Sequence, residues 1–295
     1  MIDLHTHTNN SDGTQTVSEL LTKAEQAGLK YLSITDHDSV GAYKELADKE
    51  TRKLFSGKIV RGTELYFKLG DVFNEVLGYG IDIDKIKDDK VFDINLRQSQ
   101  ELGFLRETYQ KFKEHGFTLS PLEVVEDSMS GYGFFGAGAV YEDIKKHPQN
   151  QELLDKNNVK NILDYYHVWV DNKESGFFVD TLQYKPSLDY VSKLIRDAGG
   201  LVFMAHIFRK KPDEAKMLLD YAISKNLIDG IEVYYKDFTT EQIEYLKQFC
   251  KEHNLLMSGG TDSHHTPNKV GVVQQEQTPI PYEIAKPWLD TIQTI

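Results

Sequence analysis

Short apolar runs recur along the whole chain, and several of them end in a histidine or a carboxylate. Longer stretches with a 3.6-residue apolar period separate them, which is typical of alternating strands and helices. The clearest such stretch follows Thr16, which with Glu19 is predicted to form a capping box. Strands are predicted to begin near seven residues: Ile2, Tyr31, Ile59, Val72, Leu201, Gly230 and Leu256.

This rhythm is interrupted in the middle of the chain. Residues 93–184 contain helical stretches, joined by short polar or glycine-rich connections, and lack the strand pattern of the flanking segments. We therefore predict a helical insertion over 93–184, covering one side of a domain formed by 1–92 and 185–295. Helices are expected at 40–55, 94–114, 121–127, 140–146, 162–170, 188–198, 212–225 and 240–254.

Histidines and carboxylates gather where the predicted strands end. His5 and His7 are two residues apart, so in an extended chain they point to the same side. Such a pair on its own also occurs as solvated edge residues. Similar positions are held further on by His37, Glu64, His206, Asp262 and His264. Because parallel strands bring their carboxyl ends to one rim, the recurrence favours a metal site there.

Six segments carry a resemblance to a known family. They are His5-Thr6-His7, Asp12-Gly13, Thr35-Asp36-His37-Asp38, Gly62-Thr63-Glu64, Ala205-His206 and Gly260-Thr261-Asp262-Ser263-His264. In this order they closely resemble the PHP (polymerase and histidinol phosphatase) superfamily. The resemblance implies a distorted seven-stranded (β/α) barrel. It is strongest to stand-alone bacterial phosphoesterases that hydrolyse nucleoside phosphates or short oligoribonucleotides.

The resemblance also implies two or three divalent ions, manganese, iron or zinc. It assigns His5, His7, Glu64 and Asp262 to the first ion, and Asp12, His37 and His264 to the third. The second ion would take Glu64, His206 and the residue at position 75. Most relatives have histidine there, whereas this chain has Glu75. A carboxylate is a harder ligand, so Glu75 favours manganese or iron over zinc, and a two-metal site stays open.

Other residues near these motifs are candidates for supporting roles. Asp36 and Asp38 flank His37, and each could orient that imidazole or satisfy loop backbone. Arg209 is the candidate for holding a terminal phosphate, and Glu232 is a candidate supporting residue near a strand end. In the insertion, Gly136-Ala137-Gly138-Ala139 stands where relatives carry an arginine and a histidine. The aromatics Tyr132, Phe134 and Phe135 could stack on a base or simply pack.

Composition narrows the classes of partner. Among 295 residues, 40% are hydrophobic and 27% charged, and the formal net charge is −12. An acidic chain argues against tight binding of long duplex DNA but permits a small phosphorylated substrate beside metal ions. The single cysteine, Cys250, is expected to be a packing residue. No leader or membrane-spanning run is visible, so a cytoplasmic location is expected; the oligomeric state stays open.

We therefore predict a metal-dependent hydrolase of phosphoric esters that uses metal-activated water on a nucleotide or short RNA. Two alternatives stay open. The same site could serve a histidinol-phosphate phosphatase, or the chain could be a metal-binding module without catalysis.

Overall fold

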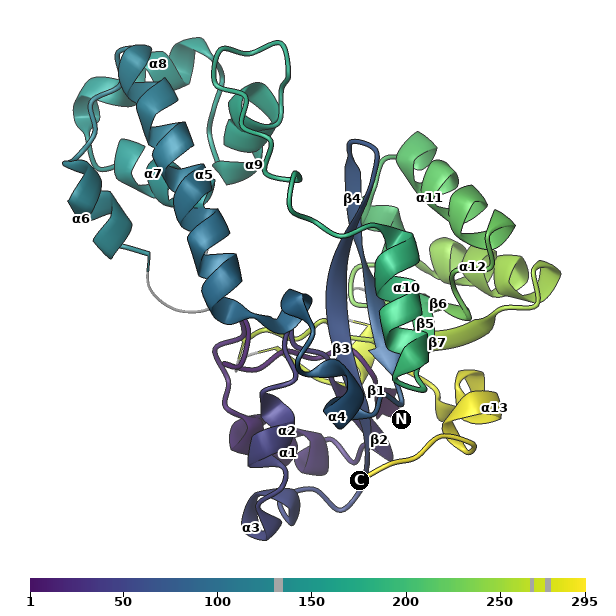
Figure 1. Ribbon diagram of the computed structural model, residues 1–295. Helices are drawn as coiled ribbons and strands as arrows, with labels where there is room; N and C mark the ends of the chain where they lie inside the picture. The colour runs from purple at the N-terminus through teal and green to yellow at the C-terminus, as the bar shows by residue number, and fades with distance from the viewer. Residues whose placement is uncertain (130–134, 266–267, 274–276) are drawn as a thin grey trace. The chain divides into compact units, whose positions relative to one another are not determined.

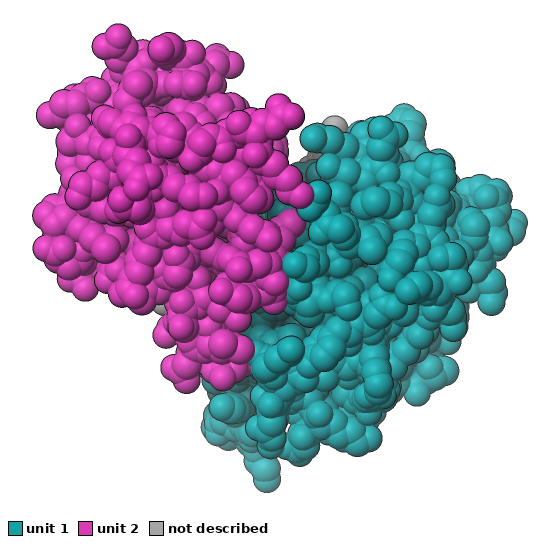
Figure 2. Space-filling model, turned by 45° about the horizontal axis from the view of Figure 1, so that its top comes forward, with its two compact units in different colours: residues 1–92, 185–295 teal, residues 93–184 magenta. Residues whose placement is uncertain are grey.

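The computed structural model describes residues 1–129, 135–265, 268–273 and 277–295. Tyr132 and Phe134 lie outside these residues. The chain divides into two compact units, one formed by 1–92 with 185–295 and the other by 93–184 (Figure 2). No helix among the described residues is long and apolar enough to cross a membrane. The predicted role of 93–184 in covering the barrel rim stays a prediction.

The first unit is built on a seven-stranded sheet in the order β1-β2-β3-β4-β5-β6-β7 (Figure 1). Its strands are β1 (Ile2–Asp3), β2 (Tyr31–Ile34), β3 (Lys58–Leu69), β4 (Val72–Tyr79), β5 (Leu201–Met204), β6 (Gly230–Tyr235) and β7 (Leu256–Gly260). All seven begin at or within one residue of their predicted starts.

The two ends of this sheet meet. The Leu4 N–H donates to the Gly259 carbonyl at 3.0 Å, and the Asp262 N–H donates to the His5 carbonyl at 2.8 Å. Gly260 permits this approach, since a Cβ there would lie 2.2 Å from the Cβ of His5. The sheet is thus nearly closed, which confirms the predicted distorted barrel.

One connection differs from the expected alternation of strand and helix. Only Gly70 and Asp71 separate β3 from β4, too few residues for a crossover, so the two strands form an antiparallel hairpin. Gly70 has a positive φ of 59°, which a tight turn requires. The β4–β5 pair is antiparallel too, whereas the other pairs are parallel. The first half of β4 therefore lies at the rim where the parallel strands end.

The helices of the first unit connect and flank these strands. They are α1 (Val17–Gln26), α2 (Ala42–Glu45), α3 (Lys49–Arg52), α4 (Ile83–Ile86), α10 (Leu188–Asp197), α11 (Pro212–Ser224), α12 (Thr240–Glu252) and α13 (Lys286–Leu289). The capping box of Thr16 and Glu19 is confirmed. The single helix expected over 40–55 is wrong: Asp48 accepts from the Thr51 N–H at 2.9 Å and starts α3 separately. A small antiparallel pair, β8 (Val272–Val273) and β9 (Thr278–Pro279), follows the barrel.

The second unit is helical and has its own hydrophobic core. Its helices are α5 (Ile94–Glu114), α6 (Leu122–Asp127), α7 (Gly136–Ile144), α8 (Gln151–Lys156) and α9 (Ile162–Tyr165), followed by a π-helical turn, Tyr166–Val170. Phe112 is fully buried at the centre of this core, where its ring lies 5.3 Å from both Tyr165 and Trp169. The long helix over 94–114 is confirmed.

Candidate metal centre

The predicted ligands all lie in the barrel unit, mostly in the segments that follow its strands; Glu64, expected at a strand end, lies inside β3 instead, and Glu75 lies inside β4. His5 and His7 follow β1, His37 follows β2, and His206 follows β5. The strands of Glu64 and Glu75, β3 and β4, are the two strands of the hairpin. Asp262 and His264 follow β7. The backbone hydrogen bonds that close the barrel bring the segment of His5 next to the segment of Asp262, although more than 250 residues separate the two in the sequence.

The structure brings all nine predicted ligands together. They form three groups whose possible ligand atoms lie within 4.8 Å of one another. The groups are His5, His7, Glu64 and Asp262; Glu64, Glu75 and His206; and His7, Asp12, His37 and His264. Glu64 belongs to two groups, as the family resemblance implied. His7 also belongs to two, which the sequence did not suggest.

The central group is the tightest. Glu64 Oε2 lies 3.0 Å from His5 Nε2 and 3.2 Å from His7 Nε2. Asp262 Oδ1 lies 3.1 Å from His7 Nε2. The side chains of His5, His7 and Glu64 are fully buried. Four ligand atoms of mixed imidazole and carboxylate type thus converge on one enclosed point.

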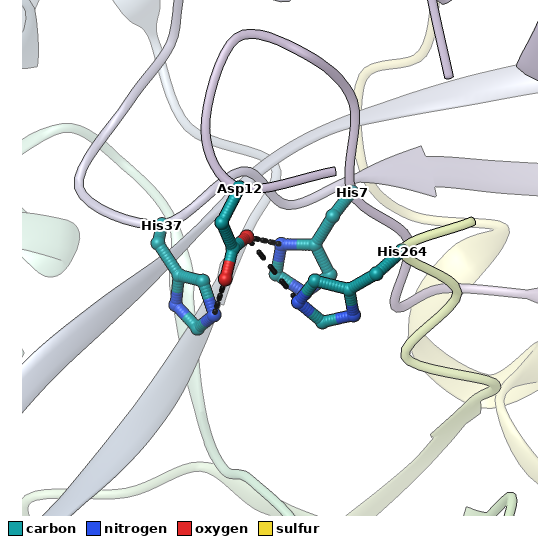
Figure 3. A group of neighbouring side chains, drawn as sticks. All are labelled: His7, Asp12, His37 and His264. Carbon is teal, nitrogen blue, oxygen red and sulfur yellow. Dashed lines mark ion pairs between the residues drawn. The ribbon is translucent and has the colours of Figure 1, made fainter. Parts of the chain in front are cut away.

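The outer group is arranged around Asp12 (Figure 3). Asp12 Oδ1 lies 3.2 Å from His264 Nε2 and 3.9 Å from His7 Nδ1, and its Oδ2 lies 3.8 Å from His37 Nε2. Asp12 and His264 are partly exposed, unlike the central ligands. His7 therefore presents one ring nitrogen to the central group and the other to this one.

The remaining group contains the departure from the family pattern. His206 Nε2 lies 3.0 Å from Glu64 Oε1, and His206 Nδ1 lies 3.9 Å from Glu75 Oε2. Glu75 is 6% exposed, and burial raises the pKa of its carboxyl group. The side chain at position 75 thus occupies the place of a third ligand beside Glu64 and His206.

Three imidazole nitrogens in the centre support a fit to metal ions. The Nδ1 atoms of His7, His37 and His206 are buried without a hydrogen-bond partner. Buried polar atoms in proteins are nearly always satisfied, so unpaired imidazole nitrogens that face carboxylates fit a site for a metal cation. Burial lowers the pKa of His37 to about 3, which leaves its imidazole neutral and able to ligate. The donor set suits manganese, iron or zinc.

The electrostatics of the central group are consistent with this. Burial alone lowers the pKa of His5, but Glu64, Glu232 and Asp262 raise it well above its usual value. For His7, hydrogen bonds to Asp262 and Glu64 outweigh burial and raise the pKa to about 10. The clustered carboxylates therefore favour positive charge at this point. A divalent cation would supply that charge.

Glu232 forms hydrogen bonds with two of the predicted ligands, His5 and His206. Its side chain is fully buried in β6, with Oε1 2.8 Å from His5 Nδ1 and Oε2 accepting from the His206 N–H at 2.8 Å. A carboxylate at Nδ1 fixes the tautomer in which the Nε2 lone pair faces the centre. The sequence indicated a supporting role for Glu232 but not which histidine it would hold.

The carboxylate of Asp36 binds the loop before Asp12 and not the imidazole of His37. Its carboxylate accepts from the Thr8 N–H at 2.6 Å, from the Thr8 hydroxyl at 2.7 Å and from the Ser11 hydroxyl at 2.7 Å. Of the two predicted roles, Asp36 therefore satisfies a loop, the one that precedes Asp12, and does not orient His37. Adjacent residues of an extended segment point to opposite sides, so the Asp36 side chain points away from that of His37. Asp36 therefore shapes the loop that carries a ligand.

Two cationic side chains and one hydroxyl group lie near Oδ2 of Asp262. Arg209 Nη1 lies 4.0 Å from Oδ2, and the Arg209 side chain is 58% exposed. Lys236 Nζ lies 3.0 Å from the same oxygen, and the Tyr235 hydroxyl donates to it at 2.9 Å. The sequence reasoning missed Tyr235 and Lys236. Their position at and just after the end of β6, the strand that pairs with β7 before Asp262, was the signal that could have found them.

The backbone is strained at three of these positions. Asp38, His206 and Asp262 have positive φ values of 45°, 23° and 50°, although none is glycine. Such conformations persist where the surroundings enforce them, and they cluster at functional sites. Here they aim the side chains of two ligands into the centre.

The comparisons with known proteins agree with this geometry. The 3′,5′-nucleoside bisphosphate phosphatase of Chromobacterium violaceum is 23% identical over 270 residues, covering 89% of this chain and 87% of that protein. The 5′-3′ exoribonuclease Rnm of Escherichia coli is 21% identical over 265 residues, covering 89% and 84%. A solved structure from Bifidobacterium adolescentis, assigned as a metal-dependent phosphoesterase, has the same fold: its TM-score is 0.64 at 23% identity, covering 96% of this chain and 94% of that one.

A model of the PHP domain matches residues 3–294, nearly the whole chain. The relatives named above are a phosphatase and an exoribonuclease, so both are hydrolases of phosphoric esters. The chain therefore belongs to the PHP domain family.

Proposed function

We propose that the chain hydrolyses a nucleotide-like phosphate ester, either a nucleoside phosphate or a short oligoribonucleotide. The observation that carries this proposal is the set of three overlapping ligand groups joined through Glu64 and His7. Adjacent divalent ions are the usual means of clamping a phosphoryl group during in-line displacement. The two relatives, one named for a nucleoside bisphosphate and one for RNA, support the nucleotide class.

Each group of residues has a defined task in this reaction. His5, His7, Glu64 and Asp262 would hold one ion, Asp12, His37 and His264 another, and Glu75 and His206 a third that shares Glu64. When bound, divalent ions supply an activated water and positive charge for phosphoryl oxygens. Manganese or iron fits the carboxylate-rich group around Glu75 better than zinc does.

The remaining residues orient and bind. Glu232 holds His5 in the ligating tautomer, and Asp36 holds the loop of Asp12. Arg209, exposed beside Asp262, is suited to bind a terminal phosphate because its planar guanidinium can donate two parallel hydrogen bonds. The enzyme names of the relatives argue against the alternative of a non-catalytic module.

Metal content and phosphate release test the proposal together. Elemental analysis is made on protein purified without added metal. Hydrolysis is measured in manganese, as released phosphate for nucleoside monophosphates, nucleoside bisphosphates and histidinol phosphate, and as released mononucleotide for short oligoribonucleotides. We expect two or three equivalents of metal and release from nucleotide substrates, abolished by Asp262→Ala. Asp84→Ala, in an exposed side chain of α4, is the matched control and should change neither result.

Two outcomes would contradict the proposal. Metal-loaded protein that cleaves none of the panel would refute the activity. Turnover of histidinol phosphate alone would replace the nucleotide class with the alternative substrate while leaving the metal centre in place.

A further inference from the structure

The two oxygens of the Asp262 carboxylate have different surroundings. Oδ1 faces the ligand cluster, where His7 Nε2 lies 3.1 Å and His264 Nδ1 3.2 Å away. Oδ2 faces the opposite way, toward Tyr235, Lys236 and Arg209. Asp262 therefore separates the metal centre from a second, cationic group of side chains.

Lys236 is the most closely held of these cations. It follows the last residue of β6, and its Nζ donates to Asp262 Oδ2 at 3.0 Å and to the Asp262 carbonyl at 3.2 Å. The Lys236 side chain is 21% exposed, so its ammonium group is neither enclosed nor fully solvated. An ammonium group has three N–H donors. Among the described residues, only Asp262 accepts from it, through two oxygens, which leaves one donor for another acceptor.

Holding Asp262 in place does not by itself require this lysine. The Tyr235 hydroxyl already donates to Oδ2 at 2.9 Å, and the Asp262 carbonyl also faces His264 Nδ1 at 2.9 Å. A neutral donor of this kind suffices to fix a carboxylate. Lys236 is a second donor to the same oxygen and carries a positive charge, and the Arg209 guanidinium lies 4.0 Å away. If Oδ1 ligates a metal, these two positive charges exceed what is needed to balance the single negative charge of Asp262.

We propose that Lys236 is a catalytic residue whose ammonium group binds a non-bridging oxygen of the substrate phosphoryl group, opposite the metal ions. This inference rests on the proposed phosphoesterase function and deepens it. Lys236 and Arg209 approach the same carboxylate oxygen, so together they form the cationic side of a phosphate site whose other side is the metal centre. The anion recognised is a phosphoryl group, and inorganic phosphate is the simplest probe.

The test is the affinity of manganese-loaded protein for inorganic phosphate, measured by calorimetry, with metal content measured on the same samples. Lys236→Met should weaken phosphate binding about tenfold or more, while the number of bound ions stays unchanged. Lys236→Arg should recover part of the affinity, because it restores the charge with a different geometry. Melting curves of both variants check that they are folded.

Two matched variants separate substrate contact from other effects. Tyr235→Phe removes the other donor to Asp262 Oδ2, so it reproduces any effect transmitted through the carboxylate. Lys247→Met removes an equal charge from a lysine that lies 5.2 Å over the Tyr234 ring and pairs with Glu244. We expect Lys247→Met to keep phosphate affinity within about twofold of the unaltered protein, and Tyr235→Phe to lose clearly less affinity than Lys236→Met does.

Two results would overturn the inference. Unchanged phosphate affinity in Lys236→Met would show that the lysine does not contact the anion. An equal loss in Tyr235→Phe would show that it acts only by holding Asp262. A failure of the proposed function is distinguishable, because the unaltered protein would then hydrolyse none of the phosphate esters tested, whatever the result with Lys236.

Discussion

Replacing Glu232 with glutamine should weaken the metal centre, although the residue touches no predicted metal position. The carboxylate accepts at both oxygens, from His5 Nδ1–H and from the His206 N–H, each at 2.8 Å. Glutamine has the same shape but only one acceptor. One of the two donors would therefore face an amide NH₂ group in a fully buried site.

The magnitude follows from that mismatch. A buried donor left without an acceptor costs about 1–3 kcal/mol. Since about 1.4 kcal/mol corresponds to a factor of ten, the manganese affinity of the central group should fall roughly 10- to 100-fold. Relaxed metal binding should also lower kcat for any ester that the protein cleaves.

Competition with a chelating indicator would measure this affinity, with kcat determined at saturating manganese. Glu244→Gln, an exposed residue of α12, is the matched control and should leave both quantities unchanged. If Glu232→Gln bound manganese as tightly as the unaltered protein, Glu232 would not be the residue that orients His5.

Three further predictions concern the rest of the molecule. Asp36→Asn should lower the free energy of unfolding by about 1–3 kcal/mol in urea titrations, because an amide replaces an acceptor of three hydrogen bonds; an unchanged midpoint would contradict the role in the loop. Cys250 is fully buried and its pKa is raised to about 12, so alkylation by iodoacetamide at pH 8 should be at least roughly a thousandfold slower in folded than in unfolded protein; rapid labelling would show that the thiol is accessible. Phe112→Ala should cost about 3–5 kcal/mol and speed hydrogen exchange in 93–184, whereas Phe112→Leu should cost less; equal exchange in both would argue against the Phe112 core.

Local patterns were sufficient for much of the fold. The seven strand starts follow from short apolar runs, and the ends of those runs also mark the ligands. His5 and His7 could be paired from the sequence because a two-residue spacing fixes their common side. The sharing of Glu64 between two groups came from the family resemblance.

What the sequence left undetermined depends on the direction of side chains and on contacts between distant segments. The orienting contacts of Glu232 join residues 26 and 227 positions apart, which no local period reports. Asp36 lies beside His37 in the chain, but its hydrogen bonds go to a loop 25–28 residues earlier. The antiparallel course of β4 follows from its two-residue connection, a feature that counting strands overlooks.

The sharing of Glu64 has a consequence for how the centre fills. Oε2 of Glu64 lies in the group of His5 and His7, and Oε1 lies in the group of His206. The two groups therefore share the single negative charge of this carboxylate. Occupancy of one position must therefore alter the affinity of the other, and the coupling is reciprocal. Two cations held there would share one carboxylate and repel each other at short range, so the expected coupling is negative. Metal should thus leave in successive steps during dialysis against chelator, and a singly loaded, inactive species should accumulate between them.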